Sequence, residues 1–292
     1  MSVPVPDPGV AHFGREGMRR FGVARVFGVR LPESAREALE GAGVPLHVVP
    51  YFMASGTTDA PALGVFAGHH GLRRPPAELE NWLRIGTDGL AHLCVRPDGV
   101  VQAVSLEADA EDMFVSSDIM AFNAAMTALD RTLPAIAASS GLSAAAADFR
   151  ELSAELRGID AGAFQERESW WPRVLDDVRH TLNFPFSAAF EYVDRAGQKH
   201  TVTETTGPGL LHPEELIWQR LAGEGVAAEQ VRRVYCELEP CMMPGHYCAV
   251  WMQQMFPTAE FTHSFDYGTD ADSRERGLKE LITHAAEQAG RR

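Results

Sequence analysis

Three residues of the types that bind zinc stand near the starts of two expected helices in the last third of the sequence. His212 precedes a proline, and Cys241 and Cys248 lie on either side of a Pro-Gly pair. One imidazole and two thiolates fill three corners of a tetrahedral zinc ion and leave the fourth open to water. An open corner is typical of catalytic zinc, so the pattern predicts metal-assisted hydrolysis.

Glu214 is the expected carrier of the proton in such a reaction. It follows His212 by two residues, which places it about 200° further round a regular helix. At the start of a helix its carboxylate can still fold toward a zinc-bound water without binding the metal. The positive ends of the two helices favour the thiolates and the negative charge that develops during the reaction.

Each half of this pattern also has a purely structural interpretation. The segment 211–215 is a good helix N-terminus, with Pro213 at the first position and two acids in the first turn. Cys241 and Cys248 could be small buried core residues, as is expected for Cys94 and Cys236 in their strands. The two pieces occur in the right order, about thirty residues apart and each before a helix, and this combination favours zinc.

The elements around these residues are expected to form a mixed sheet covered by helices. The order is strand, strand, helix, strand, helix, strand, helix, because the later strands are separated by crossovers long enough for parallel pairing. The expected ranges are strands 188–193 and 199–204, helix 213–221, strand 232–238, helix 247–255, strand 260–266 and helix 273–287. Ligands of such sheets bind where strands end and helices begin, which is where the chemical residues lie.

The motif His212-x-Glu214, followed by Pro240-Cys241 and Cys248, is similar to the signature of the cytidine deaminase-like superfamily. Within it, the Pro-Gly-x-Tyr-Cys continuation resembles a bacterial branch found among polymorphic-toxin deaminases. The resemblance implies that His212, Cys241 and Cys248 bind zinc and that Glu214 is the acid and base. Activated water would then replace the amino group of a cytosine or adenine base.

One feature departs from that signature. The commoner spacing is Cys-x-x-Cys, whereas six residues lie between Cys241 and Cys248 here. The floor of the pocket must therefore differ, and the preferred base does not carry over. The sequence leaves open cytosine or adenine, and DNA, RNA or a free nucleotide.

Alternating residues near the end of the chain are weaker candidates for substrate contacts. Phe261 and Phe265 are expected in the core. His263 alternates with them, and Asp266 and Tyr267 end the strand, where the rim of a pocket would lie. These last three residues are predicted to contact substrate.

The first half is expected to be an α+β domain with helices outside a mainly antiparallel sheet. Residues 45–53 are β-prone, segments 91–96 and 100–106 flank a turn, 117–133 is helical, and an Ala- and Ser-rich run at 135–147 suggests a joint. Three segments resemble the SUKH superfamily of bacterial immunity proteins: Trp82–Asp88, Val95–Val100, and Phe114–Ser117 with Phe122. We therefore expect a SUKH-like domain over 10–155, a helical linker over 156–182 and a deaminase-like domain over 183–292.

The net charge of the chain indicates which kind of substrate it can bind. The chain of 292 residues has 26 basic and 40 acidic residues, a net charge of −14, and residues 183–292 alone carry ten basic and sixteen acidic residues. This charge opposes loose capture of a polyphosphate chain and favours a small nucleotide over a long single-stranded nucleic acid.

Localisation and the remaining partners are expectations from the same pattern. The first fourteen residues lack a basic start followed by an apolar run, and no stretch approaches the ~18 apolar residues of a membrane span, so we expect a cytoplasmic protein without a membrane partner. A toxin is an expected partner of the first half. The alternative is a non-catalytic immunity or partner-binding protein with a structural zinc site.

Overall fold

The computed structural model describes residues 7–22, 28–57, 59, 61–106 and 111–290. It divides into two compact units, one of residues 1–135 with 147–174, the other of residues 136–146 with 175–292. The predicted fold classes, α+β for the first half and α/β with a mixed sheet for the second, are confirmed. Among the described residues, no helix combines the length and apolar character that crossing a membrane requires. Residues 1–6 of the N-terminal segment discussed above lie outside the described part.

The first unit is built on an antiparallel sheet. Six strands pair in chain order, from β3 to β8, and a two-stranded sheet joins β1 (Met18–Arg19) to β2 (Val44–Pro45). The six are β3 (His47–Val48), β4 (Phe52–Ala54), β5 (Leu83–Thr87), β6 (His92–Val95), β7 (Val101–Val104) and β8 (Met113–Ser116). The expected hairpin across residues 97–99 is the β6–β7 pair. The β-prone segment 45–53 is divided between short strands, because the chain turns at Pro50 and pairs β3 with β4.

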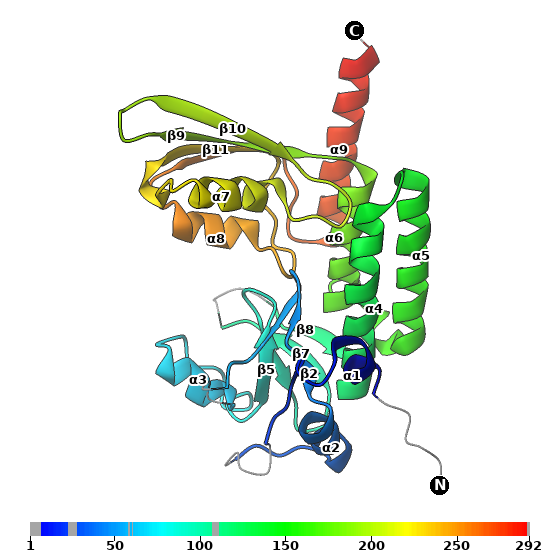
Figure 1. Ribbon diagram of the computed structural model, residues 1–292. Coiled ribbons are helices and arrows are strands. Elements are labelled where there is room, and N and C mark those ends of the chain that lie inside the picture. The colour runs from blue at the N-terminus through cyan, green and yellow to red at the C-terminus, as the bar shows by residue number, and fades with distance from the viewer. Residues whose placement is uncertain (1–6, 23–27, 58, 60, 107–110, 291–292) are drawn as a thin grey trace. The chain divides into compact units, whose positions relative to one another are not determined.

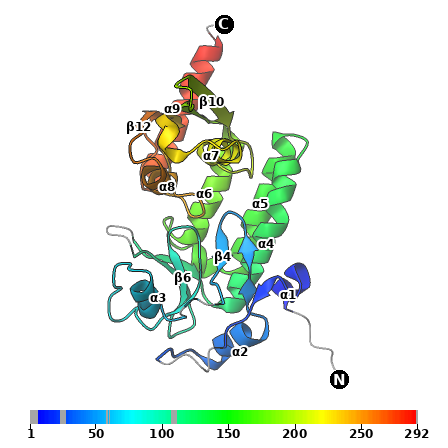
Figure 2. The same ribbon diagram turned by 60° about the vertical axis from the view of Figure 1, so that its left-hand side comes forward.

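Helices surround this sheet. They are α1 (Pro8–Phe13), α2 (Glu33–Gly41), α3 (Leu63–His69), α4 (Ile119–Ala138) and α5 (Leu142–Ile159), with a 3₁₀ turn at Ala161–Phe164. The two long helices α4 and α5 run side by side as an antiparallel pair (Figure 1 and Figure 2). The Ala- and Ser-rich run at 135–147, where a joint was expected, contains the end of α4, the connection to α5 and the start of α5. All of it except residues 139–141 is helical, as its alanines favour.

Helix α6 (Trp170–Asn183) contributes to both units, since the division between them falls after Val174. In its first turn, the indole Nε1 of buried Trp170 donates to Oδ2 of Asp88 at 2.8 Å. This hydrogen bond fixes the start of the helix within the first unit. The later turns carry Asp177 and His180 in the second unit.

The second unit has a four-stranded mixed sheet in the order β10-β9-β11-β12. Three strands pair antiparallel and β12 runs parallel to β11, as the predicted crossovers require. The strands are β9 (Ser187–Val193), β10 (Lys199–Thr205), β11 (Val231–Leu238) and β12 (Glu260–Phe265). The helices are α7 (Pro213–Gly223), α8 (Cys248–Met255) and α9 (Ala271–Gly290), with a 3₁₀ turn at Ala228–Gln230.

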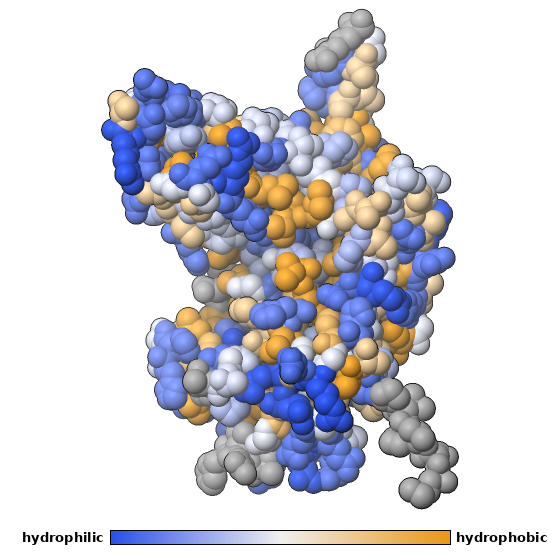
Figure 3. Space-filling model, viewed as in Figure 1, coloured by the Kyte–Doolittle hydropathy of each residue, from blue (hydrophilic) through white to orange (hydrophobic). Residues whose placement is uncertain are grey.

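One face of this sheet forms the core, and the other is largely polar. Helices α7 and α8 lie on the same side of the sheet (Figure 1), and residues of α7, α8 and α9 join one cluster of buried side chains with β9 and β11. On β11, buried Val234 and Cys236 alternate with exposed Arg233 and Tyr235. The β9–β10 hairpin presents a mostly hydrophilic surface (Figure 3). The buried face and the ends of β11 and α7 hold the predicted site.

Candidate active site

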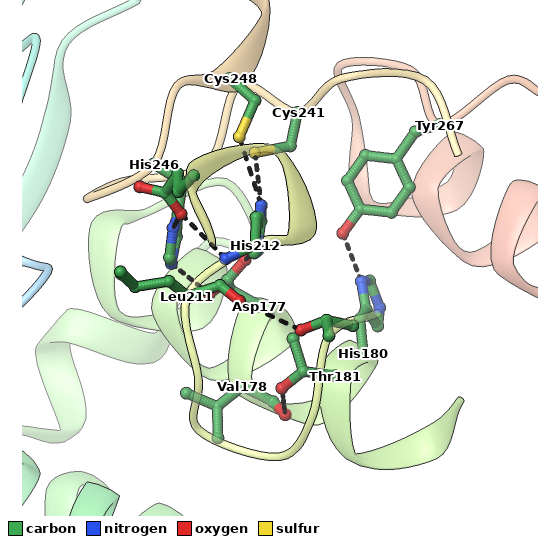
Figure 4. A network of polar contacts seen from close by, with 12 residues as sticks. Asp177, Val178, His180, Thr181, Leu211, His212, Cys241, His246, Cys248 and Tyr267 are labelled. Carbon is green, nitrogen blue, oxygen red and sulfur yellow. Dashed lines mark hydrogen bonds and ion pairs between the residues drawn. The ribbon is translucent and has the colours of Figure 1, made fainter. Parts of the chain in front are cut away.

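His212, Cys241 and Cys248 meet in the interior of the second unit. Nδ1 of His212 lies 3.4 Å from Sγ of Cys241 and 3.5 Å from Sγ of Cys248 (Figure 4). Two ligands at tetrahedral corners of zinc, with bonds of ~2.0 Å to nitrogen and ~2.3 Å to sulfur, lie ~3.6 Å apart. The donor set therefore fits zinc, and both nitrogen–sulfur distances match those expected around the ion.

Local sequence explains how the three side chains reach this point. His212 is the residue before α7, and Pro213 fills the first helical position, where no backbone N–H is needed. Cys241 follows the end of β11, and its carbonyl accepts a hydrogen bond from the backbone of Ala249 at 3.1 Å. Cys248 is the first residue of α8.

The six residues between the two thiols form a tight turn. Gly245 has a φ of 84° and Tyr247 a φ of 43°, which is left-handed backbone. That conformation costs a non-glycine residue about 1–2 kcal/mol, and such strain gathers at functional sites. The turn brings Cys248 back beside Cys241 despite their unusual separation in sequence.

The two thiols differ in how readily they ionise. Burial opposes ionisation of both, but a hydrogen bond from Cys248 and the nearby His212 hold the pKa of Cys241 well below its usual value. Burial and the neighbouring Cys241 thiolate raise the pKa of Cys248 well above its usual value. Cys241 is thus the more readily ionised of the two thiols, and the thiolate is the form that binds metal.

Glu214 is buried beside this cluster. Burial raises the pKa of its carboxyl group, and one of its oxygens, Oε2, has no hydrogen-bond partner within the described chain. A buried carboxyl oxygen without a partner is costly, so such groups are commonly kept for chemistry. A raised pKa brings the carboxyl group closer to the range in which it can both accept and donate a proton near neutral pH.

A small pocket adjoins the cluster. Its volume of about 10 Å³ is close to the minimum that holds one water molecule. It is lined by Asp177, His180, Phe186, His212, Glu214, Leu238, Glu239, Cys241 and Tyr267. Its charged lining residues are acidic, so this part of the site suits a neutral base better than a phosphate.

Three pocket residues form the wall away from the thiols. The Tyr267 hydroxyl and Nδ1 of His180 lie 2.5 Å apart (Figure 4), and Oε2 of Glu239 accepts hydrogen bonds from the backbone N–H groups of Tyr267 and Gly268, each at 3.0 Å. Burial and the nearby Arg179 lower the pKa of His180 to about 4, so its imidazole is neutral. Of the three residues predicted to contact substrate, the structure places Tyr267 in the pocket.

His263 and Asp266 do not line this pocket. They pair with each other at 3.1 Å, and the side chain of Asp266 is 93% exposed. With Glu239 they lie close enough to share a cation, but the group is largely exposed, as acidic clusters without a metal often are.

Sequence reasoning missed the polar groups behind His212. Oδ1 of Asp177 lies within hydrogen-bond distance of Nε2 of His212, at 3.0 Å, and the ring of His246 stacks on the ring of His212. Asp177 follows Trp170 by seven residues and Val174 by three, which places a carboxylate in the apolar stripe of α6. This position could have shown from the sequence that Asp177 has a polar partner, because a charged residue on a buried helix face needs one.

Two models of known protein families match the chain. A family model described as Xanthomonas-like deaminase matches residues 185–284, and one described as SUKH-4 immunity protein matches residues 10–177. The second match includes most of the segment predicted as a linker and ends at Asp177. Searches of curated proteins and of solved structures found no match.

The SUKH-4 match covers more than half of the chain, and the deaminase match contains His212, Glu214, Cys241 and Cys248. The chain therefore belongs to the SUKH-4 immunity protein family and carries a Xanthomonas-like deaminase domain in its second half.

Proposed function

We propose that the second half is a zinc-dependent hydrolytic deaminase that removes the amino group from a cytosine or adenine base. The observation that carries the proposal is the position of His212 Nδ1, within 3.5 Å of both thiol sulfurs and next to the buried carboxyl of Glu214. His212, Cys241 and Cys248 would hold the metal. When bound, zinc lowers the pKa of a water molecule toward neutrality and so supplies the nucleophile.

The side chains of the pocket would divide the remaining work. Glu214 takes a proton from the attacking water and delivers it to the departing amino group, which leaves as ammonia. Phe186 and Tyr267 present aromatic surface to the base, and the pocket must widen to admit it. The neutral His180 and the hydroxyl of Tyr267 offer hydrogen bonds to the base edge.

A small nucleotide suits this half better than a long nucleic acid. No Lys or Arg is among the residues that line the pocket, and residues 183–292 carry a net negative charge. Binding of a nucleic-acid backbone depends on basic side chains along the strand. We therefore expect a free nucleotide to be deaminated faster than single-stranded DNA or RNA.

The whole chain is proposed to act in a bacterial toxin and immunity system, because an immunity domain and a deaminase domain occur in one polypeptide. A toxin protein is the proposed partner of the first half. Both zinc-binding thiols must stay reduced, as they do in the cytoplasm.

Ammonia release by the full-length protein tests the enzyme. It is measured on a panel of nucleosides, nucleotides and single-stranded DNA and RNA, together with zinc content. Glu214→Gln should lower turnover at least 100-fold while about one zinc per chain remains. The matched control is Glu224→Gln, an exposed residue that pairs with Arg220, and it should leave turnover unchanged. Full activity in Glu214→Gln would overturn the mechanism, and silence of the wild-type protein on the whole panel with zinc bound would favour a binding protein.

A further inference from the structure

A buried carboxylate links the metal-binding histidine to a second histidine. Oδ1 of Asp177 lies 3.0 Å from Nε2 of His212, and Oδ2 lies 3.1 Å from Nε2 of His246. The side chains of all three residues are at most 5% exposed. Because a buried carboxylate is costly unless it is paired, the two imidazoles are its necessary partners.

Glu215 contacts the ring nitrogen of His246 that does not face Asp177. Its Oε2 lies 2.7 Å from Nδ1 of His246 and accepts a hydrogen bond from the backbone N–H of His212 at 2.9 Å. His246 is thus held at both ring nitrogens, and the residue that holds it also fixes the backbone of His212. The two imidazole rings stack in parallel, 3.9 Å apart with an angle of 1° between their planes (Figure 4).

These contacts determine which nitrogen of His212 faces the thiols. With Nε2 directed at Asp177, Nδ1 is the nitrogen that faces Cys241 and Cys248, and it can offer its lone pair to a metal once it carries no proton. A hydrogen bond from the far nitrogen of a metal-binding histidine sets its tautomer and ring orientation, and losing it typically weakens metal binding 10–100-fold.

Asp177, His212 and His246 could also share a cation of their own, since one ligand atom from each lies within 4.8 Å of the others. The two distances from Asp177 are those of ordinary hydrogen bonds, which satisfy the carboxylate without a metal. The hydrogen-bonded interpretation is therefore preferred, and the number of metal ions bound distinguishes the two.

We propose that Asp177 and His246 are positioning residues of the zinc site: Asp177 orients His212 toward the thiols, and His246, held by Glu215, fixes Asp177. The inference rests on the proposed function, since it assumes that His212 binds zinc. Asp177 comes from α6 and lies outside the segment that matches the deaminase family, so the metal site is completed by a residue that precedes it.

Zinc affinity of the full chain tests this inference. It is measured by competition with a chromophoric chelator, and the absorption spectrum of the Co²⁺-substituted protein reports the geometry of the site. Asp177→Asn keeps the size of the side chain but removes its charge and one acceptor. The matched control is Asp176→Asn, because Asp176 is on the same helix and pairs with Arg179 instead. His246→Gln keeps Asp177 but removes the imidazole that contacts its Oδ2. This variant replaces Asp177→Asn in the test if Asp177→Asn fails to fold.

We expect Asp177→Asn to bind zinc 10–100-fold more weakly with an altered Co²⁺ spectrum, His246→Gln to show a smaller loss, and Asp176→Asn to match the wild type. A zinc affinity and a Co²⁺ spectrum of Asp177→Asn equal to those of the wild type would overturn the inference while leaving the proposed function intact. If Asp177→Asn does not fold, the same result in His246→Gln would overturn it. Two zinc ions per chain would replace the hydrogen-bonded interpretation by a second metal site. A wild-type protein that binds no zinc would instead defeat the proposed function itself.

Discussion

The imidazole rings of His212 and His246 lie parallel, 3.9 Å apart, and both direct Nε2 at the carboxylate of Asp177. The orientation of His212 is therefore set by protein groups, independently of a metal. This distinguishes the site from small zinc domains, in which metal binding and folding are one event.

Removal of zinc should accordingly loosen the second unit without unfolding it. The core of β9, β11 and α7 contains Phe190, Ile217 and Val234, which are fully buried among other apolar side chains and do not bind the metal. Dialysis against a chelator should leave the far-ultraviolet circular dichroism nearly unchanged. The melting temperature should fall by on the order of 10 °C, as expected when a ligand bound at ~100 times its Kd is removed, and return with zinc. A chelated protein with the spectrum of an unfolded chain would contradict a prebuilt site.

Stability of the first unit should depend on the protonation of His92. Burial and the adjacent guanidinium of Arg84 lower the pKa of His92 to about 4, and its Nδ1 accepts a hydrogen bond from Arg84 at 3.1 Å. The unfolded chain has a histidine pKa near 6.5, so it binds more protons than the folded chain between about pH 4 and pH 6.5. The stabilisation is thus present above pH 6.5 and is lost as the pH falls.

Between pH 7 and pH 5 the wild type should lose about 2 kcal/mol more unfolding free energy than His92→Asn, whose amide oxygen can replace Nδ1 as acceptor. Chemical denaturation at both pH values measures the difference. The control is His47→Asn, because His47 is exposed on β3 and its replacement should leave the pH dependence unchanged. Equal losses of unfolding free energy between pH 7 and pH 5 in the wild type and in His92→Asn would exclude this role for His92.

Close packing at Gly277 should couple α9 to the pocket. A Cβ atom there would lie 1.8 Å from the carbonyl oxygen of Asp266 and 3.4 Å from Cα of Tyr267. Gly277→Ala must push this backbone away, at a cost of about 1–3 kcal/mol, and displace Tyr267 from the pocket wall. Turnover should fall while one zinc per chain remains.

Gly223→Ala is the matched control for that variant. Gly223 ends α7, and a Cβ atom there would have no neighbour within 4 Å among the described residues. Alanine should stabilise this helix by about 0.5–1 kcal/mol. Thermal unfolding and ammonia release measured on both variants check the prediction. Equal stability and turnover in the two would show that the Asp266 and Tyr267 backbone does not constrain the site.

Periodicity and helix-start signals predicted the ββαβαβα order, and the resemblance to the deaminase signature added the expectation that His212, Cys241 and Cys248 meet. They work because a helix start places its first residues at the edge of a sheet whatever the details of packing. The same signals marked 45–53 as β-prone, but an apolar run does not reveal the turn at Pro50 that separates β3 from β4. They also placed His263 with Tyr267, although only Tyr267 lines the pocket.

The groups that surround His212 could not be found in the same way. Asp177 is 35 residues before His212 and Glu239 is 27 residues after it, and no local pattern ties side chains that meet only through tertiary packing. His246 is between the two cysteines, but a histidine beside a metal motif could equally have been a ligand. Its pairing with Asp177 and Glu215 needed coordinates.

The most direct test of the account is X-ray absorption at the zinc edge of the full-length protein. The account predicts about one zinc per chain, bound by one nitrogen at ~2.0 Å, two sulfurs at ~2.3 Å and one light atom that completes the tetrahedron. Cys94→Ala, which removes a buried thiol of the first unit, should give the same spectrum. A zinc-free protein after reconstitution, or a spectrum without sulfur ligands, would contradict it.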